Sequence, residues 1–339
     1  MHETRPEQVR DDVGVVRLFE PIIREVGSPL TEEMLRPLDP RCEVVQFGHP
    51  LSDADFQTLA DWLRDYPAVT LRAFADGTGA DLDFLRFFPT LRAFHADFSY
   101  RTLVSLDGLN HLPADLTYLG LGQTKKRLSL APLARFTELQ RLYLEGQSKD
   151  IEVIGHLRTI TSLTLRSITL PNLSLLVPLT RLRALDLKLG GTRDLALLPE
   201  VGALQYLELW MVRGLHDLTP IADIPTLEYL FLQALKQVAA LPSFGNCTHL
   251  TRVHLETMNG LSDLTPLLTA PALTQLTIAD MPQLQPADVA VLAAHPTLQQ
   301  LSAGLGSRRK NDEVARLLPL PPVHGIERHP ALAARTQLP

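Results

Sequence analysis

A leucine hexad, LxxLxL, returns at a nearly constant interval and constrains the fold more than any other feature of this chain. Successive copies begin 21 to 25 residues apart. The clear copies are LTYLGL (116–121), LQRLYL (139–144), ITSLTL (160–165), LRALDL (182–187), LQYLEL (204–209), LEYLFL (227–232), LTRVHL (250–255) and LTQLTI (273–278), and the weaker ones are AVTLRA (68–73), LRAFHA (91–96) and LQQLSA (298–303). Alternation within LxL is typical of a short strand with one buried face. A single unit cannot bury its own leucines, so the repeats must stack and their strands must form one parallel sheet.

The segments between the hexads repeat as well. Most copies are preceded by three apolar residues spaced i, i+3 and i+6, as in Leu218, Ile221 and Ile224. This spacing fits 3₁₀ or irregular turns, and the short repeat leaves no room for a long helix. We therefore predict an α/β solenoid of about eleven stacked repeats, with a parallel β-sheet on its concave face and short turns on its convex face.

The pattern resembles the short class of leucine-rich repeat, of about 22–23 residues, found in bacterial internalins and in a eukaryotic phosphatase regulatory subunit. The resemblance covers roughly residues 68–306. It implies a horseshoe fold, a bacterial source and a protein-binding role. One position departs from the family, which usually places asparagine three residues after the hexad. Here that position holds Thr124, Gln147, Ile168, Gly190, Val212, Leu235, Met258 and Met281. We expect an apolar stack to replace the amide ladder in the later repeats.

Both ends of a solenoid must be covered, because the last repeat would otherwise expose its core. We predict an N-terminal α/β cap over 1–66, with a strand at 42–47 and an amphipathic helix at 52–66 that begins at Ser52. The solenoid is expected over 67–306. A C-terminal cap helix at 311–318 and a loose, Pro- and Ala-rich tail are expected within 307–339.

Charge and composition restrict the classes of partner. The formal net charge is −6, whereas a general nucleic-acid binder needs a basic surface. The basic run Lys125, Lys126 and Arg127 is typical of a solvated loop. The N-terminus lacks the apolar core of a secretory signal and no apolar run is long enough to span a membrane, so we expect neither nucleic-acid binding nor membrane insertion. A cytoplasmic location is favoured, and export without a cleaved signal is the alternative.

No residue pattern predicts a catalytic, cofactor or metal site. The string GLGQTKK (120–126) lies inside a repeat and lacks the spacing of a phosphate loop. Cys247 and His295 both take the third apolar position of their repeats, so both are expected to pack in the solenoid. Aspartates recur before the first convex leucine and are expected to accept turn N–H groups. These are Asp81, Asp194, Asp217 and Asp263.

Strand alternation places the residues that flank the hexad leucines on the concave face. Four of the six tyrosines and one of the two tryptophans fall at these positions. Tyrosine and tryptophan dominate interface hot spots, although neighbouring rings also stabilise a sheet by stacking on each other. We predict a partner-binding patch centred on the repeats at 204–256. Its residues are Tyr143, Tyr206, Glu208, Trp210, Tyr229, Phe231, Gln233, Arg252, His254 and Glu256.

The function predicted from these features is a protein–protein interaction module that binds a partner protein on the concave face. One alternative is an effector or enzyme-recruiting protein of the ligase kind, which would be expected to carry a further catalytic domain. Another is a ligand-sensing regulator, but small ligands prefer deep pockets to an open sheet.

Overall fold

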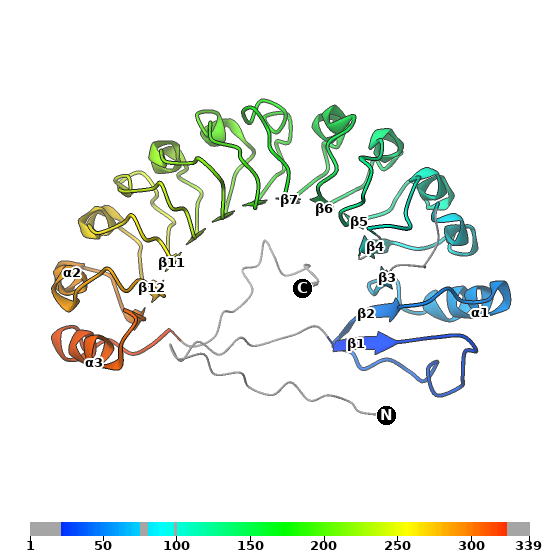
Figure 1. Ribbon diagram of the computed structural model, residues 1–339, viewed down its shortest axis with the longest axis horizontal. Helices are drawn as coiled ribbons and strands as arrows, with labels where there is room; N and C mark the ends of the chain where they lie inside the picture. The colour runs from blue at the N-terminus through cyan, green and yellow to red at the C-terminus, as the bar shows by residue number, and fades with distance from the viewer. Residues whose placement is uncertain (1–21, 75–80, 98–99, 324–339) are drawn as a thin grey trace. The chain divides into compact units, whose positions relative to one another are not determined.

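The computed structural model describes residues 22–74, 81–97 and 100–323 of the chain (Figure 1). Its contacts divide into two compact units, with the boundary between Ile168 and Thr169. We call the described residues 22–168 the N-terminal unit and 169–323 the C-terminal unit. The parts of the expected caps at 1–21 and 324–339 lie outside the described residues.

The N-terminal unit is a stack of parallel strands, each paired with the next in the sequence. Between the strands, the chain forms one α-helix and several 3₁₀ turns on the opposite side (Figure 1). The strands are β1 (Ile22–Glu25), β2 (Cys42–Phe47), β3 (Thr70–Phe74), β4 (Ala93–Asp97), β5 (Tyr118–Leu121), β6 (Arg141–Glu145) and β7 (Ser162–Arg166). The helical segments are α1 (Asp53–Leu63), η1 (Asp83–Phe87), η2 (Asp107–His111), η3 (Ala131–Arg135) and η4 (Ile151–His156).

The C-terminal unit repeats the same plan, again with parallel pairing in sequence order. Its strands are β8 (Ala184–Lys188), β9 (Tyr206–Trp210), β10 (Tyr229–Gln233), β11 (Arg252–Glu256), β12 (Gln275–Ala279) and β13 (Gln300–Ala303). Its helical segments are η5 (Leu198–Glu200), η6 (Thr219–Asp223), η7 (Thr265–Thr269), α2 (Pro286–Ala290), η8 (Val291–Ala294) and α3 (Arg308–Leu317). The predicted solenoid of parallel strands and short 3₁₀ turns is thereby confirmed.

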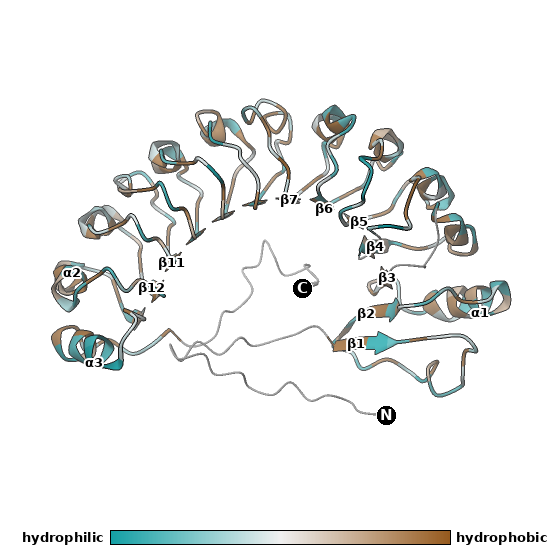
Figure 2. Cartoon of the chain, in the orientation of Figure 1, coloured by the Kyte–Doolittle hydropathy of each residue, from teal (hydrophilic) through white to brown (hydrophobic). Residues whose placement is uncertain are grey.

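The core of each unit lies between the strands and the turns, where the leucines of successive repeats are buried. Figure 2 shows hydrophobic residues in the coils of both units. Leu207, for example, pairs in register with Leu185 and Leu230, and none of the three is exposed. The positions that hold asparagine in the related repeats are also buried. Gln147 donates its amide to Thr124, whereas Leu235, Met258 and the other later residues form the expected apolar stack.

A repeated backbone turn ends the strands of the C-terminal unit. The residue after each of β8 to β12 adopts a left-handed conformation, with φ of 50° at Met211, 53° at Ala234 and 52° at Thr257. After β8 to β11 its N–H donates to the carbonyl of the last residue of the following strand, as from Met211 to Gln233 at 2.9 Å. These bonds supply partners for loop backbone groups that have no asparagine beside them.

A capped helix lies near each end of the described chain. Ser52 caps α1 by accepting the Asp55 N–H, and Phe56 from this helix packs on Phe84 in the first repeats. At the other end α3 begins at Arg308, three residues earlier than predicted, because Ser307 accepts the Lys310 N–H and caps the helix there. Among the described residues no helix is long and apolar enough to cross a membrane.

Candidate functional site

The side chains on the strand side of the C-terminal unit form three rows that run across its strands. We call this surface the strand face. The strands β8 to β12 pair residue by residue, so each row contains one residue from each of these five strands. The first row is Ala184, Tyr206, Tyr229, Arg252 and Gln275, the second is Asp186, Glu208, Phe231, His254 and Thr277, and the third is Lys188, Trp210, Gln233, Glu256 and Ala279. The predicted patch therefore lies on adjacent strands, with the exception of Tyr143.

The aromatic residues of this face pack against one another. The rings of Tyr206 and Tyr229 meet edge to face, with centroids 5.2 Å apart. The Phe231 ring stacks on His254, with centroids 4.3 Å apart. The Tyr206 hydroxyl donates to Glu208 at 2.9 Å. Such contacts hold the rings in fixed orientations, so little side-chain entropy remains to be lost when another surface packs on them.

Charged and amide groups surround these rings. Lys188 forms an ion pair with Glu208 at 2.9 Å, and its ammonium lies 5.7 Å from the centre of the Trp210 ring. The Arg252 guanidinium lies 5.2 Å from the Tyr229 ring centre. Glu256 accepts from the amide of Gln233 at 2.7 Å and contacts His254 at 3.1 Å. The polar groups are therefore linked to the aromatic cluster.

Exposure divides the predicted residues into two sets. Tyr206, Glu208, Tyr229 and His254 are buried, and burial raises the pKa of Tyr229 above its usual range. The second set is half-buried and can still contact a partner. It consists of Trp210, Phe231, Gln233, Arg252 and Glu256. Alternation correctly predicts the face on which these side chains lie, but it does not predict that their neighbours cover some of them.

Tyr143 lies in the N-terminal unit, where the strand side holds a buried polar network that the sequence analysis did not identify. Arg72, only 1% exposed, donates two hydrogen bonds to Asp97, at 3.0 and 2.7 Å, and a third to Gln46 at 3.1 Å. His95 Nδ1 lies 2.6 Å from the Tyr118 hydroxyl, and its ring centre lies 5.3 Å from that of Tyr143. The sequence signal for this network is a pair of opposite charges at outward positions of adjacent repeats.

Burial determines the charge state of His95. Desolvation lowers the pKa of His95 to about 4, although the neighbouring Asp97 carboxylate opposes that shift, so the ring is neutral near pH 7. The ring occupies space beside Gly120, where an added Cβ would lie 2.1 Å from His95 Nδ1. Glycine at this position therefore makes room for the imidazole on the neighbouring strand.

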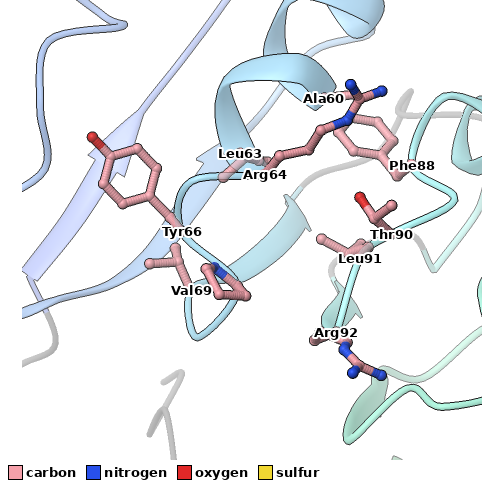
Figure 3. Close-up of a pocket in the computed structure, with 10 residues that line it drawn as sticks. Ala60, Leu63, Arg64, Tyr66, Val69, Phe88, Thr90, Leu91 and Arg92 are labelled. Carbon is pink, nitrogen blue, oxygen red and sulfur yellow. The ribbon is translucent and has the colours of Figure 1, made fainter.

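A shallow pocket opens between the end of α1 and the starts of β3 and β4 (Figure 3). Its volume is about 310 Å³, and its floor is apolar. Arg64, Thr90, Arg92 and Tyr66 provide the polar groups of its lining, which includes no carboxylate, histidine or cysteine. No acid–base pair is therefore present in it. Within the described residues, no group of three or more histidine, cysteine, aspartate or glutamate side chains is placed to hold a metal ion.

The fold resembles those of leucine-rich-repeat proteins of known structure. An internalin from Listeria monocytogenes, InlF, is 16% identical over 92% of this chain and 83% of its own, with a TM-score of 0.51. TLR13, solved in a complex with ssRNA13, is also 16% identical and has a TM-score of 0.57 over 78% of this chain, which spans 39% of the TLR13 chain. No protein-family model and no curated protein sequence matches this chain. The fold is that of a leucine-rich-repeat solenoid.

The remaining sequence candidates have structural roles in this solenoid. Asp217 and Asp263 accept the N–H groups of Thr219 and Thr265 at 2.8 Å, and Asp81 and Asp194 accept equivalent bonds. Hydrogen bonds from Thr219 and Thr265 lower the pKa of Asp217 and Asp263 respectively. His295 is buried and bonds the Leu267 carbonyl. No helix follows Gly120 until η3 begins at Ala131, so the GLGQTKK segment lacks the geometry of a phosphate loop.

Cys247 is fully buried, and its thiol donates to the Ile221 carbonyl at 3.4 Å. Desolvation raises the pKa of this thiol to about 11, and only the thiolate is nucleophilic. We expect a thiol reagent at pH 8 to label Cys247 in the native protein at least about 100-fold more slowly than in urea, because two pKa units reduce the thiolate fraction by that factor. Mass spectrometry of tryptic peptides measures both rates. Rapid native labelling with loss of an activity would instead support the catalytic alternative.

Proposed function

We propose that this protein is an interaction module that binds a partner protein on the strand face of its C-terminal unit, the face that the leucine pattern predicts to be concave. The observation that carries the proposal is the placement of Trp210 and Phe231. Both are large and half-buried, and they lie on adjacent strands of a face whose other half-buried residues are mostly polar. Aromatic side chains of this kind are the usual anchors of protein interfaces.

The surroundings of the two rings support this role. Phe231 is held by His254, and Lys188 lies over Trp210, so both rings are oriented before a partner arrives. Gln233, Arg252 and Glu256 flank them with half-exposed hydrogen-bonding groups. A partner that inserts an apolar side chain between the rings meets a polar rim, which is the usual arrangement of an interface.

The decisive experiment begins with capture of the partner from the native cell and continues with binding measurements on single variants. We expect Trp210→Ala and Phe231→Ala each to weaken binding by about 2–4 kcal/mol, a loss of tens- to hundreds-fold. Their melting temperatures are expected to fall less than that of Tyr229→Ala, because neither side chain fills the leucine core and Phe231 only partly buries itself against Tyr206 and Tyr229. Tyr229→Ala removes a buried ring and is expected to lower stability as well as affinity.

Trp62→Ala is the matched control, because Trp62 is the other tryptophan of the chain and is also half-buried, but it lies on α1. This variant is expected to bind normally. Normal binding by both Trp210→Ala and Phe231→Ala would show that the partner uses another surface. Equal losses of stability and affinity in both variants would show that the aromatic residues stabilise the sheet rather than bind.

A further inference from the structure

The loops that leave β4, β5 and β6 in the N-terminal unit carry a concentration of positive charge. Residues 100–106, 122–130 and 146–150 contain five cationic side chains and a single carboxylate, Asp150, in a chain whose formal net charge is −6. All five cations are exposed. We call this surface the basic edge, and its cations are Arg101, Lys125, Lys126, Arg127 and Lys149.

Hydrogen bonds stack these three loops directly on one another. The Lys125 N–H donates to the Tyr100 carbonyl at 2.7 Å, which joins the first loop to the second. The Leu130 N–H donates to the Lys149 carbonyl at 3.0 Å and joins the second loop to the third. The buried amide of Gln147 also donates to Thr124 at 2.7 Å. These bonds hold the loops that carry the cations against one another.

Described carboxylates near the basic edge do not neutralise it. Asp97, Asp115 and Glu145 form ion pairs with Arg72, Arg92 and Arg166 respectively. Asp150 accepts the hydroxyl of Ser129. Among the described residues, Lys125, Lys126, Arg127 and Lys149 form no ion pair. Bringing four like charges onto neighbouring loops is unfavourable unless something anionic lies against them.

Apolar side chains lie in the first of these loops. Val104 is 54% exposed and Tyr100 is 46% exposed, which places them among the most exposed large hydrophobic residues of the described chain. The backbone bond between Tyr100 and Lys125 brings this loop against the cations. The surface thus offers positive charge and apolar contact side by side.

We propose that the basic edge binds an extended acidic segment of a protein, a short run of aspartate or glutamate that carries a neighbouring apolar residue. The carboxylates pair with the lysines and Arg127, and the apolar residue packs on Val104 and Tyr100. A nucleic acid fits less well, because its phosphates continue beyond three repeats and meet a molecule that is acidic overall. This surface lies in the N-terminal unit, so binding to it does not depend on the strand face of the C-terminal unit.

The test uses a fluorescein-labelled ten-residue peptide with eight glutamates and two leucines, and follows its anisotropy with the full-length chain at low salt. We expect saturable binding that weakens as salt is added, because the contacts are between exposed charges. Lys125→Gln/Lys126→Gln is expected to weaken binding about tenfold. Val104→Ser is expected to weaken it several-fold for the glutamate–leucine peptide and not for a peptide with serine in place of leucine.

Arg308→Gln/Arg309→Gln on α3 is the matched control, since it removes the same charge from another exposed site. This variant should bind the peptide within twofold of the unmodified chain. Equal weakening by both double variants, or no peptide binding at low salt, would overturn the proposal. Tighter binding of a ten-nucleotide single-stranded DNA, or of phosphatidylserine vesicles, with the same sensitivity to Lys125 and Lys126 would assign the basic edge to that ligand instead.

Discussion

Replacing Asp97 with alanine is expected to lower the free energy of unfolding of the N-terminal unit by about 3–5 kcal/mol. The reason is the state of Arg72, whose guanidinium is buried and bound by both carboxylate oxygens of Asp97. Without that carboxylate, the charged Arg72 guanidinium remains in a poorly solvated site. Gln46 and the Phe74 ring are then beside it. Urea unfolding followed by circular dichroism measures the loss.

Two further variants separate two effects on stability. One is the cost of leaving the Arg72 guanidinium buried without its carboxylate partner, and the other is the contribution of the ion pair itself. Arg72→Met/Asp97→Leu removes both charges and replaces them with apolar groups, and we expect it to recover most of the stability lost in Asp97→Ala. Arg166→Ala is the control, because Arg166 pairs with Glu145 on the same side but is 30% exposed. Its expected cost is below about 1 kcal/mol. An Asp97→Ala protein as stable as this control would contradict the assignment of a buried charge.

The sequence predicts the repeat architecture well because the leucine pattern acts through burial. In the hexad at 204–209 the leucines face the core, and β9 covers Tyr206–Trp210, from the third hexad residue to one residue past the hexad. The same offset recurs in β10 and β11. A shift of one residue would turn every leucine to the other face, so the pattern specifies the strand register strongly.

The edge of the N-terminal sheet was harder to predict. The strand β1, Ile22–Glu25, has no hexad, and its residues are exposed or half-buried. It is the first strand of the sheet and, among the described strands, pairs only with β2, so few of its side chains need to be apolar. A short edge strand carries a weak hydrophobic signal for this reason.

The sequence pattern also did not predict which side chains of the strand face are buried. Alternation shows that Tyr206 and His254 point outward, but their burial depends on the neighbours that register places beside them, Tyr229 and Phe231. The network around Arg72 was missed because its hexads are the weakest of the series. Its strands are predicted by their hexads, but hexad leucines specify only the inward positions, whereas the Arg72–Asp97 ion pair joins outward positions of two strands.

Leu207→Asp is expected to unfold the C-terminal unit under conditions in which the unmodified chain is stable. Leu207 has no exposed surface and lies between Leu185 and Leu230 in the column of leucines. Truncation of such a residue alone costs about 2–5 kcal/mol, and a carboxylate without a partner adds a large desolvation cost. A domain is typically stable by about 5–15 kcal/mol, so the sum approaches the whole stability of the unit.

Two further variants identify the cause of this loss. Leu207→Ala removes the packing without adding a charge and is expected to remain folded with reduced stability. Thr251→Asp adds a carboxylate at an exposed position before β11 and is expected to cost less than about 1 kcal/mol. Circular dichroism and limited proteolysis distinguish the three proteins. Because a solenoid repeat is stabilised by its neighbours, loss of the column at Leu207 should expose β8 and β10 to protease together with β9. Cleavage confined to β9, with a cooperative transition like that of Thr251→Asp, would show that the repeats do not share one continuous core.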